Sequence, residues 1–123
     1  MAFDKTVSGE YRTMMGVSPG EMALTLQQTT VDIIGANCGR GMDIMVGICR
    51  EIREINSDIP LLVHANAGLP AYVDGKTVFP ETPAQMAGMV KELIDAGASI
   101  IGGCCGTTPE HIRQIALAVK SFR

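Results

Sequence analysis

Three cysteines stand where metal-binding thiols would be expected. Cys38 and the adjacent pair Cys104 and Cys105 each lie in a glycine-rich segment that follows a short aliphatic run. If those runs are parallel strands, their carboxyl ends share one edge of a sheet, and the three thiols could converge on one ion. Three thiolates around zinc leave one tetrahedral position open, which is typical of a catalytic rather than a structural site.

The open position would suit a substrate thiol. Such a thiol would bind as the thiolate, and a zinc ion that already carries several negatively charged sulfurs withdraws little electron density from it. Because neighbouring cysteines can bridge only through a strained ring, the Cys104–Cys105 pair favours reduced thiols over a disulfide framework. The remaining cysteine, Cys49, is expected in the middle of a helix and is interpreted as a small buried hydrophobic residue.

Four polar residues near the same predicted edge are further candidates. Asn37 and Asn66 could orient a substrate through their amides, and the alternative is hydrogen bonding within their loops. His64 could be a fourth metal ligand or a proton shuttle, although a histidine at the end of a buried strand is more often a hydrogen-bonded filler. His111 is expected to belong to a helix cap.

Short aliphatic runs and amphipathic segments alternate along the chain. The runs at 32–36, 60–64 and 99–103 lack the alternation of half-exposed strands, so they predict parallel strands buried on both faces. Helices are predicted to begin after Ser18, Thr82 and Thr108, each followed by proline, and a fourth is expected over 42–55. This order predicts βα units on a parallel sheet.

Two segments fall outside that alternation. The loop at 67–81 is longer than the other connections, which indicates a substrate-facing role. The opening residues Ala2, Phe3 and Asp4 could be the tail of an earlier strand. We interpret residues 1–123 as one partial domain, because 123 residues fall short of the roughly 250 of a complete eight-stranded α/β barrel.

The composition excludes several classes of function. The chain is 46% hydrophobic and 19% charged with a net charge of −3, which gives no sign of a nucleic-acid partner. It contains no apolar run of roughly 20 residues that could span a bilayer, and its polar start lacks the apolar region of a secretory signal. We therefore expect a cytoplasmic protein without membrane partners.

Four sequence motifs show a resemblance to a known family. The strings GANCG (35–39), NAGLP (66–70), VDGKTV (73–78) and GGCCGTTPEHI (102–112) resemble the homocysteine S-methyltransferases. That family includes the homocysteine-binding module of cobalamin-dependent methionine synthases and the betaine–homocysteine methyltransferases. The resemblance implies the C-terminal half of a (β/α)8 TIM-type barrel, with about three parallel strands and four helices.

The resemblance also implies a metal site and a reaction. By motif, the family's zinc ligands correspond to Cys38, Cys104 and Cys105, and the asparagine that can fill the open zinc position corresponds to Asn66. The family usually has proline before that asparagine, whereas this chain has Ala65, preceded by His64. The expected function is methyl transfer to homocysteine or a similar thiol to give methionine, from a donor held on another domain or protein.

Two alternatives to that function remain open. The chain could be a catalytically incomplete zinc-binding fragment or one subunit of a split methyltransferase, because three strands cannot close a barrel. Self-association, or a partner supplying the first half-barrel, would then be expected. A redox or zinc-storage role for the cysteine pair is a weaker reading, since it explains neither the NAGLP motif nor the convergence of three cysteines.

Overall fold

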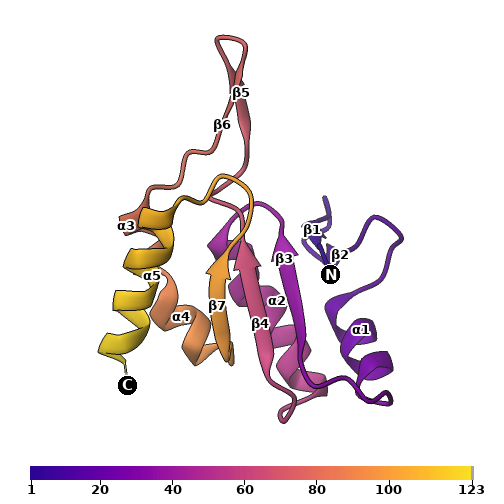
Figure 1. Cartoon of the computed structure of the whole chain (residues 1–123). Helices are drawn as coiled ribbons and strands as arrows, with labels where there is room; N and C mark the ends of the chain where they lie inside the picture. Colours follow the sequence, from indigo (N-terminus) through magenta and orange to yellow (C-terminus); the bar gives the residue numbers. More distant parts are fainter. Residues whose placement is uncertain (123) are drawn as a thin grey trace.

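Three parallel strands form the centre of the molecule. A computed structural model, which describes residues 1–122, places β3 (Ile34–Cys38), β4 (Leu61–Ala65) and β7 (Ile100–Gly103) side by side in that order (Figure 1). Both neighbouring pairs are parallel, and their register sets Cys38 opposite Ala65 and Ala65 opposite Gly103. The predicted α/β class with three parallel strands is confirmed, although each strand begins one or two residues later than expected.

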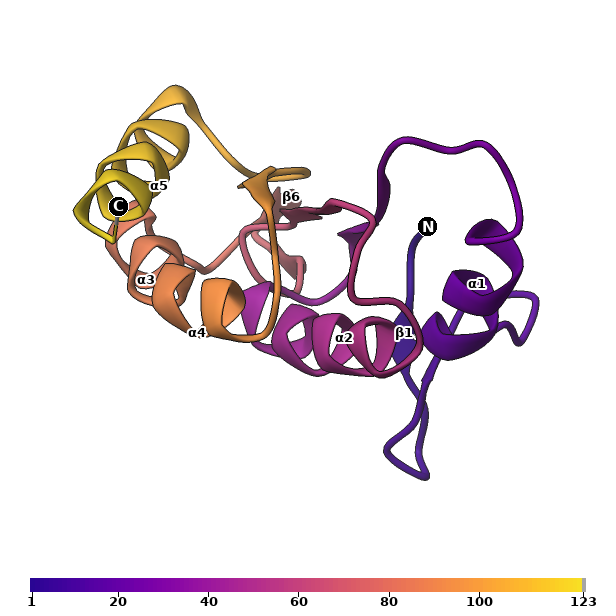
Figure 2. The same cartoon turned by 90° about the horizontal axis from the view of Figure 1, so that it is seen from below.

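Helices cover one face of this sheet. Seen from below, α2 (Met42–Ile55), α4 (Val90–Asp95) and α5 (Pro109–Ser121) follow an arc on the outer side of the strands (Figure 2). On that side Leu61 and Val63 are fully buried. Their neighbours Leu62 and His64 face the other way and are only partly covered. The prediction that the strands are buried on both faces is therefore wrong for the described residues, because no second layer covers the inner face.

Three helices begin as the sequence predicts. Ser18, Thr82 and Thr108 cap α1 (Pro19–Leu26), α3 (Pro83–Gly88) and α5, and each has proline at the first helical turn. Each cap is a reciprocal capping box, in which the residue three positions on also bonds back to the cap. In α5 that residue is His111, so the expected cap role of His111 is confirmed.

The segment after Thr82 is a broken helix rather than one continuous helix. It consists of α3 and α4, separated at Met89, whose backbone (φ −88°, ψ −7°) departs from regular helix geometry. Gly88 precedes the break, and glycine is among the weakest helix formers. The two pieces together occupy the place of the single helix expected between the second and third strands.

Two β-hairpins were not predicted. In the first, β1 (Asp4–Lys5) pairs with β2 (Tyr11–Arg12), and in the second, β5 (Ala71–Val73) pairs with β6 (Lys76–Val78). Asp74 and Gly75 connect β5 and β6 with φ angles of 49° and 77°, as a tight hairpin turn requires. This second hairpin occupies the predicted long loop and projects beyond the carboxyl edge of the sheet (Figure 1).

The first residues of the chain lie along the free edge of β3. The Met1 nitrogen donates to the Gly35 carbonyl at 2.8 Å, and the Asn37 N–H donates to the Met1 carbonyl at 3.0 Å. This pair of bonds is the pattern of a parallel ladder. It agrees with the expectation that the opening residues continue a strand, and Phe3, which follows, is 1% exposed.

Helix α2 supplies much of the hydrophobic core. Its residues Met42, Met45, Ile48, Cys49 and Ile52 are fully buried. The interpretation of Cys49 as a core residue is therefore confirmed. No helix among residues 1–122 combines the length and the hydrophobicity needed to cross a membrane.

The uncovered face of the sheet predicts self-association. Leu62 and Ile100 are paired in register on this face, and Ile100 is 38% exposed on an edge strand. Because exposed apolar faces and unpaired strand edges attract other chains, sedimentation at micromolar concentration should give a mass above the 13.0 kDa of one chain. Ile100→Lys should shift the distribution towards the monomer. A wild-type chain that sediments only as a monomer would contradict this expectation.

Candidate metal centre

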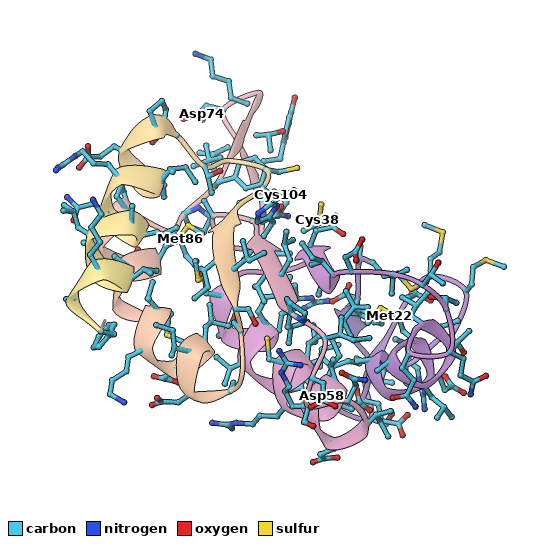
Figure 3. All side chains as sticks on the ribbon, turned by 60° about the horizontal axis from the view of Figure 1, so that its bottom comes forward. Met22, Cys38, Asp58, Asp74, Met86 and Cys104 are labelled. Atoms are coloured by element: carbon cyan, nitrogen blue, oxygen red, sulfur yellow. The ribbon has the colours of Figure 1, made fainter. Side chains whose placement is uncertain are left out.

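The three predicted cysteines converge at the carboxyl edge of the sheet. The Sγ atoms of Cys38, Cys104 and Cys105 all lie within 4.8 Å of one another. The Cys38 and Cys104 sulfurs are 3.1 Å apart, and the Cys104 and Cys105 sulfurs are 4.0 Å apart. Figure 3 shows Cys38 and Cys104 next to each other above the strands. The sequence-based grouping of these residues therefore agrees with the geometry.

This arrangement fits the size of a zinc–thiolate site. With zinc–sulfur bonds of about 2.3 Å, tetrahedral geometry separates two sulfurs by about 3.8 Å. The two sulfur–sulfur separations, 3.1 Å and 4.0 Å, lie on either side of that value. Three soft thiols with no carboxylate among them favour zinc over magnesium or calcium.

An unusual backbone conformation aims the Cys38 side chain. Cys38 is the last residue of β3 and does not lie beyond the strand end as predicted, and its φ is 61°. A left-handed conformation outside glycine costs of order 1 kcal/mol or more. Gly39 continues the turn with φ of 71°, where a Cβ would press on Ile44 and on the Phe3 carbonyl. Because of this turn, the Cys38 side chain does not follow the regular alternation of side chains along the strand and instead points towards Cys104.

The Cys104–Cys105 pair is held by backbone bonds to the end of β4. The Cys104 N–H donates to the Ala65 carbonyl at 2.8 Å, and the Ala67 N–H donates to the Cys105 carbonyl at 2.9 Å. The Thr107 hydroxyl donates to the Cys104 carbonyl at 2.7 Å. These bonds fix the pair although Cys105 itself is exposed.

Asn66 lies between the two groups of cysteines. Its side-chain Nδ2 donates to the Gly39 carbonyl at 2.8 Å, and its Oδ1 accepts from the Cys105 N–H at 3.0 Å. The residue is 7% exposed. Asn66 is therefore at the centre, as expected, and both ends of its amide are bonded to the loops that carry the thiols.

Asn37 contacts a candidate ligand directly. Its Nδ2 donates to the Cys38 sulfur at 3.4 Å, which favours the thiolate form of Cys38. The bond to Cys104 outweighs this effect, so the pKa of Cys38 is raised, while the same bond lowers the pKa of Cys104. In the metal-free pair, the hydrogen bond therefore favours Cys104 as the first of the two to become a thiolate.

Neither histidine belongs to the thiol cluster. Among the described residues, the group with Cys38 that could hold a metal ion contains cysteines alone. His64 lies on the uncovered face, paired in register with Asn37 and Gly102, and its ring covers Gly102 so closely that a Cβ there would collide with it. His111 points elsewhere, bonding Thr108 and the Glu81 carbonyl at 2.8 Å.

A pocket of about 580 Å³ adjoins the centre. Gly39 and Asn66, which also bond within the thiol site, line this pocket together with Phe3, Asp4 and Arg40. The Arg40 Nε donates to Asp4 at 2.6 Å, which holds the pKa of that carboxyl below its usual range. The pocket therefore offers charged groups of both signs beside the three cysteines.

Comparison with known proteins identifies one family. The family model for homocysteine S-methyltransferase matches residues 2–119. The methionine synthases of Mycobacterium tuberculosis and Mycobacterium leprae are 34% identical over 119 residues and 36% identical over 115 residues, covering 96% and 93% of this chain. The chain spans about a tenth of the length of these relatives (10% of each).

Solved structures give the same picture of the fold. The apo form of the homocysteine methyltransferase MmuM from Escherichia coli superposes with a TM-score of 0.65 at 24% identity, covering 85% of this chain and 34% of that one. The oxidized form gives a TM-score of 0.59 at 26% identity, covering 88% and 31%. The chain thus matches about a third of a larger α/β protein.

The different environments of the cysteines predict an order of reactivity. In the metal-free chain at about pH 8, iodoacetamide should label Cys104 before Cys38, because a lowered pKa provides more thiolate. Cys49 should react last, because burial raises its pKa to about 11. Peptide mass spectrometry with fragmentation would resolve the sites, and Cys49 labelling at the rate of Cys104 would contradict the geometry.

Proposed function

The chain belongs to the homocysteine S-methyltransferase family, and we propose that it carries the zinc–thiolate centre that activates homocysteine, or a similar thiol, for methylation. The observation that carries the proposal is the convergence of Cys38, Cys104 and Cys105 within 4.8 Å at the carboxyl edge of a parallel sheet. That edge is where α/β proteins build their active sites. Methylation of homocysteine would yield methionine.

In this proposal the sheet is the C-terminal half of a (β/α)8 barrel, and residues 1–123 form one partial domain. The strand order β3-β4-β7, with helices on the outer side only, is the arrangement of consecutive βα units in such a barrel. The uncovered inner face would then correspond to the barrel interior. Superposition on about a third of MmuM supports the same interpretation.

The cysteines and Asn37 have different roles in the proposed centre. Zinc held by Cys38, Cys104 and Cys105 would supply a position at which the substrate thiol loses its proton yet remains nucleophilic. Cys104, with its lowered pKa, provides the first thiolate for that centre. The Asn37 N–H bonds the Cys38 sulfur and offsets part of the negative charge that three thiolates collect.

The methyl group would come from outside the chain. The substrate sulfur forms its new bond to the methyl carbon, and the donor leaves with the electron pair of the broken bond. We place the donor on another domain or protein, at the open side of the thiol centre. The site needs reduced thiols, and all four cysteines are free, which suits a cytoplasmic protein.

A zinc-binding fragment or a subunit of a split methyltransferase is the second candidate function. The uncovered sheet face with Leu62 and His64 favours it, because a barrel enzyme buries that face around its core. A partner supplying the first half-barrel, or a second copy of the chain, would then complete the structure. Methyl transfer that appears only after such a partner is added would favour this second candidate.

Metal content tests the three-cysteine site. The reduced chain should bind about one zinc ion, and Cys38→Ala or Cys104→Ala should lower the stoichiometry sharply, since two thiols make a much weaker site. Cys49→Ala is the matched control, because Cys49 is buried in the core and away from the cluster. Elemental analysis after gel filtration would give the ratios. Full zinc content in Cys38→Ala would disprove the site.

Homocysteine should alter the coordination of the bound zinc. X-ray absorption at the zinc edge should gain one sulfur neighbour and lose one oxygen or nitrogen neighbour on addition of homocysteine, because a free thiol can enter as a thiolate. Asn66 is a candidate for the displaced neighbour, whereas His64 lies outside the thiol cluster. Methionine, which has no free thiol, is the control and should leave the spectrum unchanged. Identical spectra with and without homocysteine would exclude an open position.

A further inference from the structure

The strands that carry the thiols are not neighbours in the sheet. Cys38 ends β3 and Cys104 follows β7, while β4 lies between them. Two strand spacings amount to about 10 Å, yet the two sulfurs are 3.1 Å apart. The loops that carry the thiols must therefore approach each other over the end of β4, and something at that end must set their separation.

Asn66, the residue that follows β4, occupies this position. Its backbone N–H donates to the Cys38 carbonyl at 3.2 Å, so the residue is tied to the β3 side of the gap. Its side chain reaches both loops, donating from Nδ2 to Gly39 at 2.8 Å and accepting at Oδ1 from Cys105 at 3.0 Å. With 7% of its surface exposed, it makes these bonds away from water.

We infer that Asn66 is a positioning residue of the metal centre, whose amide spans the two loops and sets the distance between Cys38 and the Cys104–Cys105 pair. The inference rests on the proposed zinc function. An asparagine suits the task because one short side chain carries both a donor and an acceptor. Aspartate keeps the acceptor and loses the donor, and alanine loses both and leaves the Gly39 carbonyl and the Cys105 N–H, whose bonds to Asn66 are partly buried, without this partner.

A positioning role and a ligand role for Asn66 predict opposite effects of aspartate. If the side chain acted chiefly as a zinc ligand, Asn66→Asp would place an anionic oxygen beside the metal and hold or strengthen zinc binding. If the side chain sets the loop separation, the same variant loses the bond to the Gly39 carbonyl and sets a carboxylate against it. Zinc binding should then weaken although a better ligand is present.

Zinc competition with a chromophoric chelator, on the full chain, would measure these effects. The dissociation constant for zinc should rise about 10- to 100-fold in Asn66→Ala, as is typical when groups that orient metal ligands are removed, and should also rise in Asn66→Asp. Circular dichroism would show whether the variants fold. If Asn66→Ala does not fold, the near-isosteric Asn66→Asp still provides the test. Unchanged or tighter zinc binding by Asn66→Asp would overturn the inference.

Asn56→Ala is the matched control. The Asn56 amide also joins backbone groups, accepting from the Asp58 N–H at 3.1 Å and the Ile59 N–H at 2.8 Å. Asp58 lies before β4, beyond the end of the sheet away from Cys38 and Cys104 (Figure 3). Asn56→Ala should cost stability and leave zinc affinity unchanged, and a loss of affinity equal to that of Asn66→Ala would overturn the inference.

A metal-free measurement separates this inference from the zinc proposal. In oxidised glutathione, the Cys38 and Cys104 thiols can form a disulfide as each glutathione disulfide is reduced to two glutathione thiols. The wild-type chain should favour this internal disulfide, whereas Asn66→Ala should shift towards mixed disulfides with glutathione. A wild-type chain that binds no zinc would contradict the proposed zinc function alone. Equal proportions of internal and mixed disulfides in the wild-type chain and in Asn66→Ala would contradict the positioning role of Asn66.

Discussion

The hydrogen-bonded register of β3, β4 and β7 is the constraint on which the metal centre depends. Cys38, Ala65 and Gly103 are paired in one row across the sheet. Cys104 therefore lies one residue beyond this row, towards the carboxyl edge. A slip of one residue would move β7 by about 3.3 Å, as much as the 3.1 Å that separates the Cys38 and Cys104 sulfurs, and would turn its side chains to the other face. Burial of Leu61 and Val63 against the helices fixes the register of β4, because a one-residue slip of β4 would turn them to the uncovered face.

The same topology brings favourable electrostatics to the thiols. Helices α2 and α5 begin at Met42 and Pro109, a few residues after Cys38 and Cys105, so their amino-terminal ends face the carboxyl edge of the sheet. The positive end of a helix dipole stabilises nearby anions, including thiolates. The βα unit formed by β3 and α2 thus contributes both to the hydrophobic core and to the environment of the thiols.

How far the sequence predicts this centre depends on the kind of contact involved. Glycine-flanked cysteines after aliphatic runs predict the three thiols, because strand ends in a parallel sheet meet whatever the details of the loops. The Asn66 bonds to Gly39 and Cys105 could not be derived in that way, since they depend on loop paths that differ by a residue or two from the expected strand ends. The β5–β6 hairpin, by contrast, carried a readable signal: Asp74-Gly75 between two short apolar-containing runs is typical of a tight hairpin turn.

Proton balance links the geometry of the centre to the thiol it would accept. Cys38 and Cys104 share a proton at 3.1 Å, and the raised pKa of Cys38 means that a bound metal must displace that proton. Metal affinity should therefore increase as pH rises towards the pKa of Cys38. A substrate thiol that enters the fourth position loses its own proton for the same reason. Each thiolate adds a negative charge, so the free-energy cost of forming the next thiolate rises. The side-chain N–H of Asn37 on the Cys38 sulfur and the backbone N–H groups of Cys38 and Cys105 beside the Cys104 sulfur reduce that cost without adding a positive charge. Neutral donors of this kind leave the sulfurs electron-rich, which is the property that a nucleophilic thiolate needs.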